Sequence, residues 1–163
     1  VLGGYTQKNS AGKVKSKGIE LSTLWKPKNV FNIGFNYNYN NTYDGTDCED
    51  PDRDATKCID QAAVRVPRHA LTSSINYKFN DEIKNSLLIK YSGEVRDYGN
   101  GNNNYTDVIL DDYITFNYNA SYKLYDTYGL FFTVNNIFDQ NYEEAYQYST
   151  MGRILNFGIK RLY

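Results

Sequence analysis

A short polar segment in the first half of the chain carries residues of the type that bind calcium. Asp50, Asp52 and Asp54 stand at positions i, i+2 and i+4, which is the spacing that opens a calcium-binding loop. The sixth position of such a loop is glycine but is Ala55 here, and the twelfth is glutamate but is Gln61 here. A solvated surface loop is therefore the simpler interpretation, and a calcium site at the three aspartates is the alternative.

The same segment holds both cysteines of the chain, Cys48 and Cys58. No histidine or further cysteine lies nearby to complete a metal site, so the pair favours a local disulfide. Disulfides form and persist in oxidising compartments. The cysteines therefore favour a periplasmic or cell-surface location for this segment.

The chain offers little for catalysis. It has one histidine, His69, and no Ser-His-Asp spacing, nucleophile elbow or pair of carboxylates on a regular element. We predict that the protein is not an enzyme and needs no cofactor. The formal net charge of -1 gives no electrostatic basis for binding nucleic acid.

The elements that would position any site are predicted to be β-strands. Between Ile114 and Leu124 every even-numbered residue is apolar or aromatic, and every odd-numbered residue is Thr, Asn, Ser or Lys. Successive side chains of a strand point to opposite faces, so this segment has one apolar and one polar face. A tilted strand of about 9–11 residues is long enough to cross a bilayer.

Similar alternation elsewhere predicts about eight strands and almost no helix. The predicted strands are residues 1–8, 13–26, 30–43, 64–79, 84–96, 109–124, 128–138 and 151–163. The predicted connections are tight turns at 26–29, 80–82 and 125–127, and long polar loops at 44–62, 97–107 and 139–149. Short turns at one end and long loops at the other are the layout of outer-membrane barrels.

We therefore predict an all-β fold, an antiparallel up-and-down meander of about eight long strands. The alternative is a soluble β-sandwich, or a small barrel with its polar face outward. Strands of soluble sheets usually run to about five or six residues. The predicted strands are mostly twice as long, which favours the membrane barrel.

Four motifs resemble those of TonB-dependent outer-membrane receptors. The segments VNNIFDQNYE (134–143) and YQYSTMGR (146–153) are similar to the N-L/I-F-D-x-x-Y signature and to the G-Y-x-x-x-G-R that opens the last strand. Upstream, KGIEL (17–21) and RVPRH (65–69) resemble K-G-V/I-E and R-x-P-x-H. The positions that carry the resemblance are Gly18, Glu20, Arg65, Pro67, Asn136, Phe138, Asp139, Tyr142, Gly152, Arg153 and Tyr163.

The resemblance extends over essentially the whole chain. It implies that residues 1–163 are the C-terminal segment of a large transmembrane barrel of the plugged, 22-stranded class, with the plug and early strands missing. It also implies the outer membrane of a Gram-negative bacterium, contact with outer-membrane lipid, and active transport energised by TonB through the missing N-terminal part.

The substrate implied by the resemblance is a scarce, bulky small molecule. The Tyr-Gln-Tyr run at 146–148 is most similar to the vitamin B12 (cobalamin) receptor branch. A ferric-siderophore or haem receptor of the same family is the alternative, and a passive porin-type barrel is a more distant one.

Tyrosines in the long loops are the predicted ligand contacts, because tyrosine offers a large contact area at a low entropy cost. The candidates are Tyr98, Tyr105, Tyr142, Tyr146 and Tyr148. The alternative is that these rings pack between loops or form an interfacial aromatic girdle.

Overall fold

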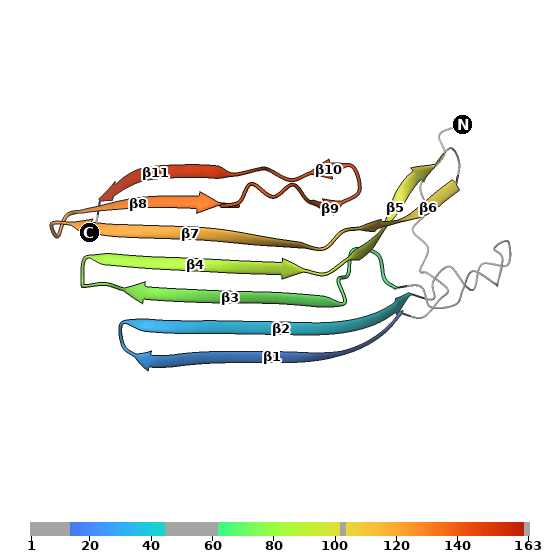
Figure 1. Cartoon of the computed structure of the whole chain (residues 1–163), viewed down its shortest axis with the longest axis horizontal. Helices are drawn as coiled ribbons and strands as arrows, with labels where there is room; N and C mark the ends of the chain where they lie inside the picture. Colours follow the sequence, from blue (N-terminus) through green and yellow to red (C-terminus); the bar gives the residue numbers. More distant parts are fainter. Residues whose placement is uncertain (1–13, 45–61, 102–103, 162–163) are drawn as a thin grey trace, which may run out of the picture.

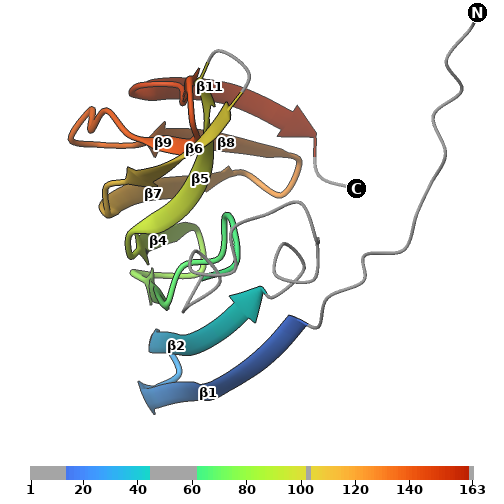
Figure 2. The same cartoon turned by 90° about the vertical axis from the view of Figure 1, so that its right-hand side faces the viewer.

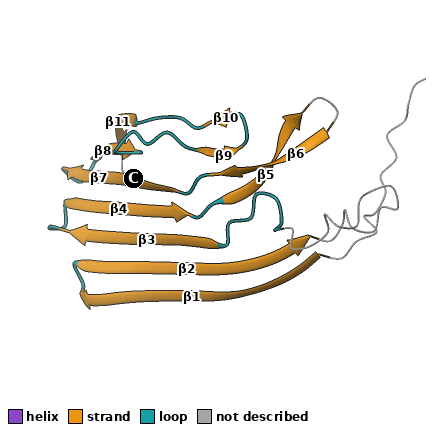
Figure 3. Ribbon diagram, turned by 45° about the vertical axis from the view of Figure 1, so that its right-hand side comes forward, coloured by secondary structure: helices purple, strands orange, loops and turns teal. Residues whose placement is uncertain are grey.

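The computed structural model describes residues 14–44, 62–101 and 104–161. Strands and loops make up this part of the chain, and it contains no helix (Figure 3). Accordingly, the described residues offer no helix long and apolar enough to span a membrane.

Seven long strands form one antiparallel sheet in the order β1-β2-β3-β4-β7-β8-β11 (Figure 1). Their bounds are Val14–Lys28 (β1), Phe31–Asp44 (β2), His69–Lys78 (β3), Ile83–Ser92 (β4), Tyr113–Leu124 (β7), Tyr128–Asn135 (β8) and Ile154–Arg161 (β11). Two small hairpins complete the described part. They consist of β5 (Val95–Gly101) with β6 (Asn104–Leu110), and β9 (Glu143–Ala145) with β10 (Tyr148–Ser149).

The two ends of the sheet differ. At one end, on the left of Figure 1, tight turns join β1 to β2, β3 to β4 and β7 to β8; we call this the short-turn end. At the other end, the long-loop end, the chain makes longer excursions between β2 and β3, β4 and β7, and β8 and β11. The predicted meander of long antiparallel strands is confirmed.

The register brings apolar residues of all seven strands to one face of the sheet. One continuous row of cross-strand partners is Trp25, Ile33, Ile75, Leu87, Tyr118, Val134 and Leu155. A nearby row on the opposite face is Asn32, Asn76, Ser86, Asn119, Thr133 and Asn156. We call these the apolar face and the polar face.

The apolar face is open. Ile19 and Phe157, on two of its strands, are 68% and 70% exposed. Among the described residues only Ala63, Leu110 and Tyr113 are buried hydrophobic residues. A β-sandwich would bury one face of each sheet against the other, so a single curved layer with an uncovered apolar face is not a sandwich (Figure 2).

Several predicted strand bounds were too long at the long-loop end. The strand predicted at 64–79 begins only at His69, because Arg65 adopts a turn with φ of 59°. The strand predicted at 128–138 ends at Asn135, where Asn136 has φ of 52°. The strand predicted at 151–163 begins at Ile154, and the strand predicted at 1–8 lies outside the described residues.

The prediction of a loop at 97–107 was wrong, because this part of the chain forms the two strands of the β5–β6 hairpin. The chain leaves the large sheet after Ser92 and pairs Val95 with Leu110 through Gly101 with Asn104. The strands predicted at 84–96 and 109–124 are thus each divided between the sheet and this hairpin. The predicted loop at 139–149 likewise contains β9 and β10.

Candidate functional site at the long-loop end

The carboxylate of Asp97 is the most enclosed group at the long-loop end. Asp97 lies on β5 and is 0% exposed. Its Oδ1 accepts hydrogen bonds from the Arg65 Nε at 2.9 Å and from the Tyr98 backbone N–H at 2.8 Å. Its Oδ2 accepts one from the Tyr146 backbone N–H at 2.7 Å. One side chain thus joins the segment before β3, the β5–β6 hairpin and the turn between β9 and β10.

These partners also set the charge of Asp97. Burial raises the pKa of the Asp97 carboxyl, but the Tyr146 N–H, the Arg65 guanidinium and the Tyr98 N–H together outweigh it. The pKa therefore lies below its usual value. The group is an anion at neutral pH, and a buried anion of this kind is stable only while its donors stay in place.

A second cluster of polar side chains lies on β4, β7 and β9. Glu144 Oε1 accepts hydrogen bonds from Lys90 Nζ at 2.9 Å and from the Tyr113 hydroxyl at 2.8 Å. The Lys90 ammonium also lies 5.4 Å from the centroid of the Tyr113 ring. The Tyr142 ring stacks on the Tyr113 ring, and the two ring centroids are 4.1 Å apart. We call Lys90, Tyr113, Tyr142 and Glu144 the mouth cluster.

The mouth cluster combines a cation, an anion and an aromatic stack in one place. The pKa of Glu144 is below its usual value because Lys90 and then Tyr113 donate hydrogen bonds to its carboxylate. The Lys90 and Glu144 side chains are 48% and 54% exposed. An approaching ligand can therefore contact both charges as well as the half-buried Tyr142 ring, whereas Tyr113 is buried beneath it.

Asn136 forms a turn directly after β8. This residue is 5% exposed, and its φ of 52° lies in the left-handed region that asparagine tolerates. Its side chain closes a turn by accepting from the Gln140 N–H at 3.0 Å and donating to the Gln140 carbonyl at 2.8 Å. Its own N–H donates to Asn117 Oδ1 at 3.0 Å.

Asp139 connects this turn to the start of β11. Its Oδ1 accepts a hydrogen bond from the Arg153 backbone N–H at 2.7 Å. A Cβ atom at Gly152 would lie 2.6 Å from the same oxygen. Only glycine at position 152 leaves room for that carboxylate, so Asp139, Gly152 and Arg153 form one clamp across the loop.

The family model described as "TonB dependent receptor-like, beta-barrel" matches residues 1–137. The chain belongs to this family. No curated protein matches it.

Solved receptor structures share the fold of this TonB-dependent receptor-like barrel segment. The pyoverdine outer membrane receptor FpvA from Pseudomonas aeruginosa PAO1 matches 91% of the chain with a TM-score of 0.72 and 19% identity. The ferric-catecholate import receptor Fiu from K12 E. coli matches 91% with a TM-score of 0.72 and 18% identity. The siderophore receptor PiuA from Acinetobacter baumannii matches 92% with a TM-score of 0.63 and 22% identity. The chain spans 21% of each of these three proteins.

The TonB-dependent receptor motifs have structural roles in the barrel wall. A Cβ atom at Gly18 would lie 2.5 Å from the Tyr39 carbonyl oxygen on β2, so glycine lets the two strands approach. Glu20 pairs with Asn38 across the same strands. Pro67 lies just before β3. The exposed Phe138 ring packs edge-on against the Phe116 ring of the apolar face, with the two ring centroids 5.1 Å apart.

The predicted ligand tyrosines of this receptor segment have different surroundings. Tyr142 belongs to the mouth cluster, and the backbones of Tyr98 and Tyr146 meet at Asp97. The ring of Tyr98 lies 5.6 Å from the Arg96 guanidinium, whereas Tyr148 is 73% exposed. The side chain of Tyr105 lies outside the described residues, as do Tyr163, the Cys48–Cys58 pair and the calcium candidates Asp50, Asp52 and Asp54.

Asp97, Lys90, Tyr113 and Glu144 were missed by the sequence analysis. Lys90 and Tyr113 belong to segments that the sequence already explains as strands, so nothing marks them as site residues. Asp97 is one of several polar residues in a row, and its type alone does not mark it either. Only its tertiary hydrogen bonds, from Arg65 and from the Tyr146 N–H, distinguish Asp97 from its neighbours. In the described part of the receptor segment, no group of three or more His, Cys, Asp or Glu side chains is placed to hold a metal ion.

The clamp provides a test of the Gly152 position. We expect Gly152→Ala to displace the Asp139 carboxylate and break its bond to the Arg153 N–H, at a cost of roughly 1–3 kcal/mol. Hydrogen exchange of the intact receptor should then be faster at the Arg153 amide. Met151→Ala is the control, because Met151 is 77% exposed. Equal protection of Arg153 in both variants would contradict the clamp.

Proposed function

We propose that this chain is part of an outer-membrane receptor that takes up a scarce, bulky nutrient with energy from the TonB system. The observation that carries the proposal is the apolar face that extends across seven strands of a TonB-dependent receptor-like barrel. A lipid-facing band of about 25 Å with a polar interior is what such a barrel requires.

The two ends of the sheet face opposite sides of the outer membrane in this proposal. The long-loop end faces the outside of a Gram-negative cell and the short-turn end faces the periplasm, which is the usual arrangement of such barrels. The apolar face contacts outer-membrane lipid. Coupling to TonB occurs through a part of the receptor outside these 163 residues. The intact receptor, of which this chain is one part, carries out transport and no enzymatic reaction.

Two classes of ligand are proposed. An iron chelate is supported by the fold likeness to FpvA, Fiu and PiuA, whose descriptions name pyoverdine, ferric catecholate and siderophore. Cobalamin is supported by the Tyr-Gln-Tyr run at 146–148. Both are bulky, and both would meet the rings of Tyr142 and Tyr148 on entering from the long-loop end.

A binding experiment on the intact receptor tests both the class of ligand and the role of the mouth cluster in binding it. Wild-type receptor is titrated with a panel of ferric siderophores and with cobalamin. For whichever ligand binds, we expect Tyr142→Ala to weaken affinity by roughly tenfold, as for an aromatic contact residue. Removing Tyr142 also exposes the Tyr113 ring on which it stacks.

The matched control is Tyr125→Ala, which removes a tyrosine that is 81% exposed in the turn at the short-turn end. Its affinity should equal that of the wild type. Equal affinities for Tyr142→Ala and Tyr125→Ala would exclude the mouth cluster from the ligand site. Failure of the intact receptor to bind or import either ligand class would contradict the proposed nutrients.

A further inference from the structure

The segment 142–150, which contains the β9–β10 hairpin, carries Tyr142 and Glu144 of the mouth cluster but is too small to be stable alone. Strands β9 and β10 have three and two residues, and the register shifts between their two cross-strand pairs. An isolated two-stranded hairpin is marginally stable at best in water. Gln147 in its turn has φ of 65°, a conformation that surrounding contacts must hold in place. Contacts with other parts of the chain therefore fix this half of the mouth cluster.

The strongest of these contacts is made by Asp97. The ion pair of the mouth cluster joins two side chains that are each about half exposed, and an ion pair this open to water is weak. The Tyr142 ring stacks on the cluster but is only half-buried. By contrast, the Tyr146 N–H donates at 2.7 Å to Asp97, a fully enclosed carboxylate. A hydrogen bond to an ionised acceptor is roughly twice as strong as a neutral one.

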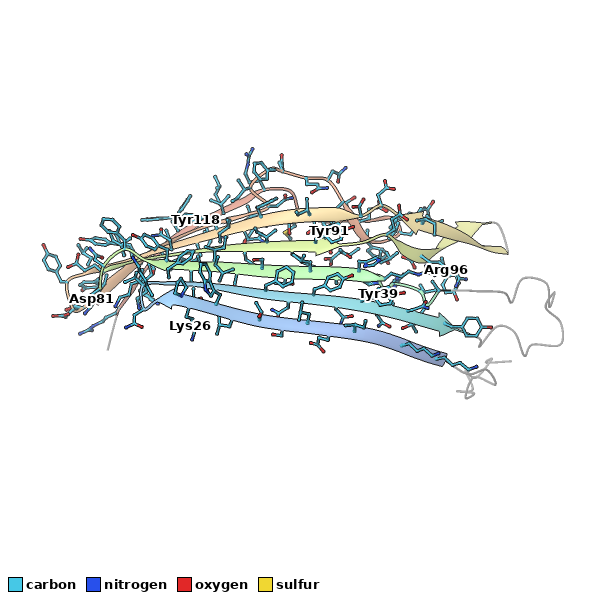
Figure 4. The ribbon with its side chains drawn as sticks, turned by 60° about the horizontal axis from the view of Figure 1, so that its bottom comes forward. Lys26, Tyr39, Asp81, Tyr91, Arg96 and Tyr118 are labelled. Carbon is cyan, nitrogen blue, oxygen red and sulfur yellow. The ribbon has the colours of Figure 1, made fainter. Side chains whose placement is uncertain are left out.

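Asp97 and its neighbour Arg96 also hold the segment 62–65, which precedes β3. Arg65 Nε donates to Asp97 Oδ1 at 2.9 Å, and the Arg65 backbone N–H donates to the Arg96 carbonyl at 2.8 Å. Arg96 Nη1 donates to the Ala62 carbonyl at 2.9 Å. Figure 4 shows Arg96 at the long-loop end of the sheet. Within the described part of the chain, Arg65 forms no hydrogen bond or ion pair with the mouth cluster. Apart from its charge, Arg65 can therefore influence the cluster through β5.

We propose that Asp97 is a positioning residue for ligand binding. By holding Tyr146, it keeps two members of the mouth cluster in the arrangement that a ligand meets. Through Arg65, it couples that arrangement to the segment 62–65. The inference rests on the proposed function, because that function assigns the mouth cluster to a ligand.

Hydrogen exchange of the ligand-free intact receptor tests the positioning directly. Arg65→Ala leaves the buried carboxylate in place and removes a side chain that is 56% exposed, so no cavity forms. The Thr150 amide and hydroxyl both donate to the Tyr142 carbonyl, at 3.4 and 2.7 Å, so the Thr150 amide reports on Tyr142. We expect exchange at the Tyr146 and Thr150 amides to accelerate by about fivefold, the lower end of the usual range for coupled sites.

Arg68→Ala is the matched control. Arg68 is an exposed arginine that also precedes β3, and among the described residues it makes no contact with Asp97. Its loss changes the net charge of the receptor as Arg65→Ala does. Exchange at both amides should equal that of the wild type.

Affinity tests the consequence for binding. Ferric pyoverdine, a ferric catecholate and cobalamin are the probes, and the variants are titrated with whichever of them the wild-type receptor binds. We expect Arg65→Ala to weaken binding by about fivefold and Arg68→Ala to leave it unchanged. Arg65→Lys should keep most of the affinity, because it keeps a cation beside Asp97. Adding Tyr142→Ala should cost less in the Arg65→Ala receptor than in the wild type, because the two residues act as one unit.

The outcomes separate this inference from the proposed function. Equal exchange at the Thr150 amide in Arg65→Ala and Arg68→Ala would overturn the inference, whether or not any probe binds. Equal affinities of these two variants, or strictly additive effects of Arg65→Ala and Tyr142→Ala, would also overturn it. A wild-type receptor that binds none of the probes would contradict the proposed function instead, and the exchange result would then decide the role of Asp97.

Discussion

Replacing Asp97 with alanine should loosen the loops of the long-loop end as a group. The change removes a buried carboxylate that accepts from Arg65, Tyr98 and Tyr146. The Arg65 side chain is 56% exposed and can be solvated by water, but the Tyr98 and Tyr146 N–H groups lose their acceptor, at a cost of roughly 1–3 kcal/mol. Because each 1.4 kcal/mol is a factor of about ten, hydrogen exchange at the Tyr98 and Tyr146 amides should accelerate by roughly one to two orders of magnitude.

Asp97→Asn should have a smaller effect, because an amide oxygen still accepts but carries no charge. Asp111→Asn is the matched control, since Asp111 is exposed beyond the β5–β6 hairpin. Its exchange pattern should equal that of the wild type. If Asp97→Ala changed only the Tyr98 amide, the carboxylate would not connect the loops.

The pH dependence of this junction follows from the lowered pKa. A carboxyl whose pKa is lower in the folded state stabilises that state above its unfolded pKa, near 3.8, and the stabilisation is lost as the pH falls through the folded value. The Asp97 contribution to the free energy of loop opening should therefore be constant from pH 7 to about pH 5. A loss of it within that range would show that the carboxyl is not held as described.

Replacing Tyr118 with arginine should destabilise the intact barrel by roughly 2–4 kcal/mol, the cost of a cation on the lipid face near the bilayer midplane. Tyr118 lies in the middle of β7 within the apolar row that crosses all seven strands. Urea titration of the receptor in lipid vesicles measures the change as a shift of the unfolding midpoint.

Two variants separate the effect of the lipid from other effects. Asn119→Arg puts the same cation one residue further along, on the polar face, and should cost much less. Tyr118→Phe removes only the hydrogen bond to Asn85, worth about 1 kcal/mol. If arginine at 118 and at 119 cost the same, the assignment of the faces would be wrong.

The faces of the sheet could be predicted because side-chain alternation in a strand needs no knowledge of its partner. Ile114, Phe116, Tyr118, Tyr122 and Leu124 lie on one face, as predicted from their spacing. Leu88 is an apolar residue at a polar-face position, where it pairs with Asn117.

The junctions between loops could not be predicted in this way. Arg65 and Asp97 are 32 positions apart, and Asp97 and Tyr146 are 49 apart, so no local pattern links them. Asn117 lies on the polar face of β7, and its position in the alternating pattern does not predict a hydrogen-bond partner. Its Oδ1 accepts from the Asn136 N–H, which makes it a support for the turn after β8.

The order of strands along the sheet has a consequence for assembly kinetics. Three of the six pairings, β1–β2, β3–β4 and β7–β8, are closed by the tight turns of the short-turn end. Closing a short connection costs the least chain entropy, so these three hairpins can form as separate units before the excursions between them are fixed. Each hairpin already has one apolar and one polar face, so it can enter a membrane side-on and in register. The excursions between β2 and β3 and between β4 and β7 then need only join preformed pairs, and their length can change without slowing the formation of any hairpin.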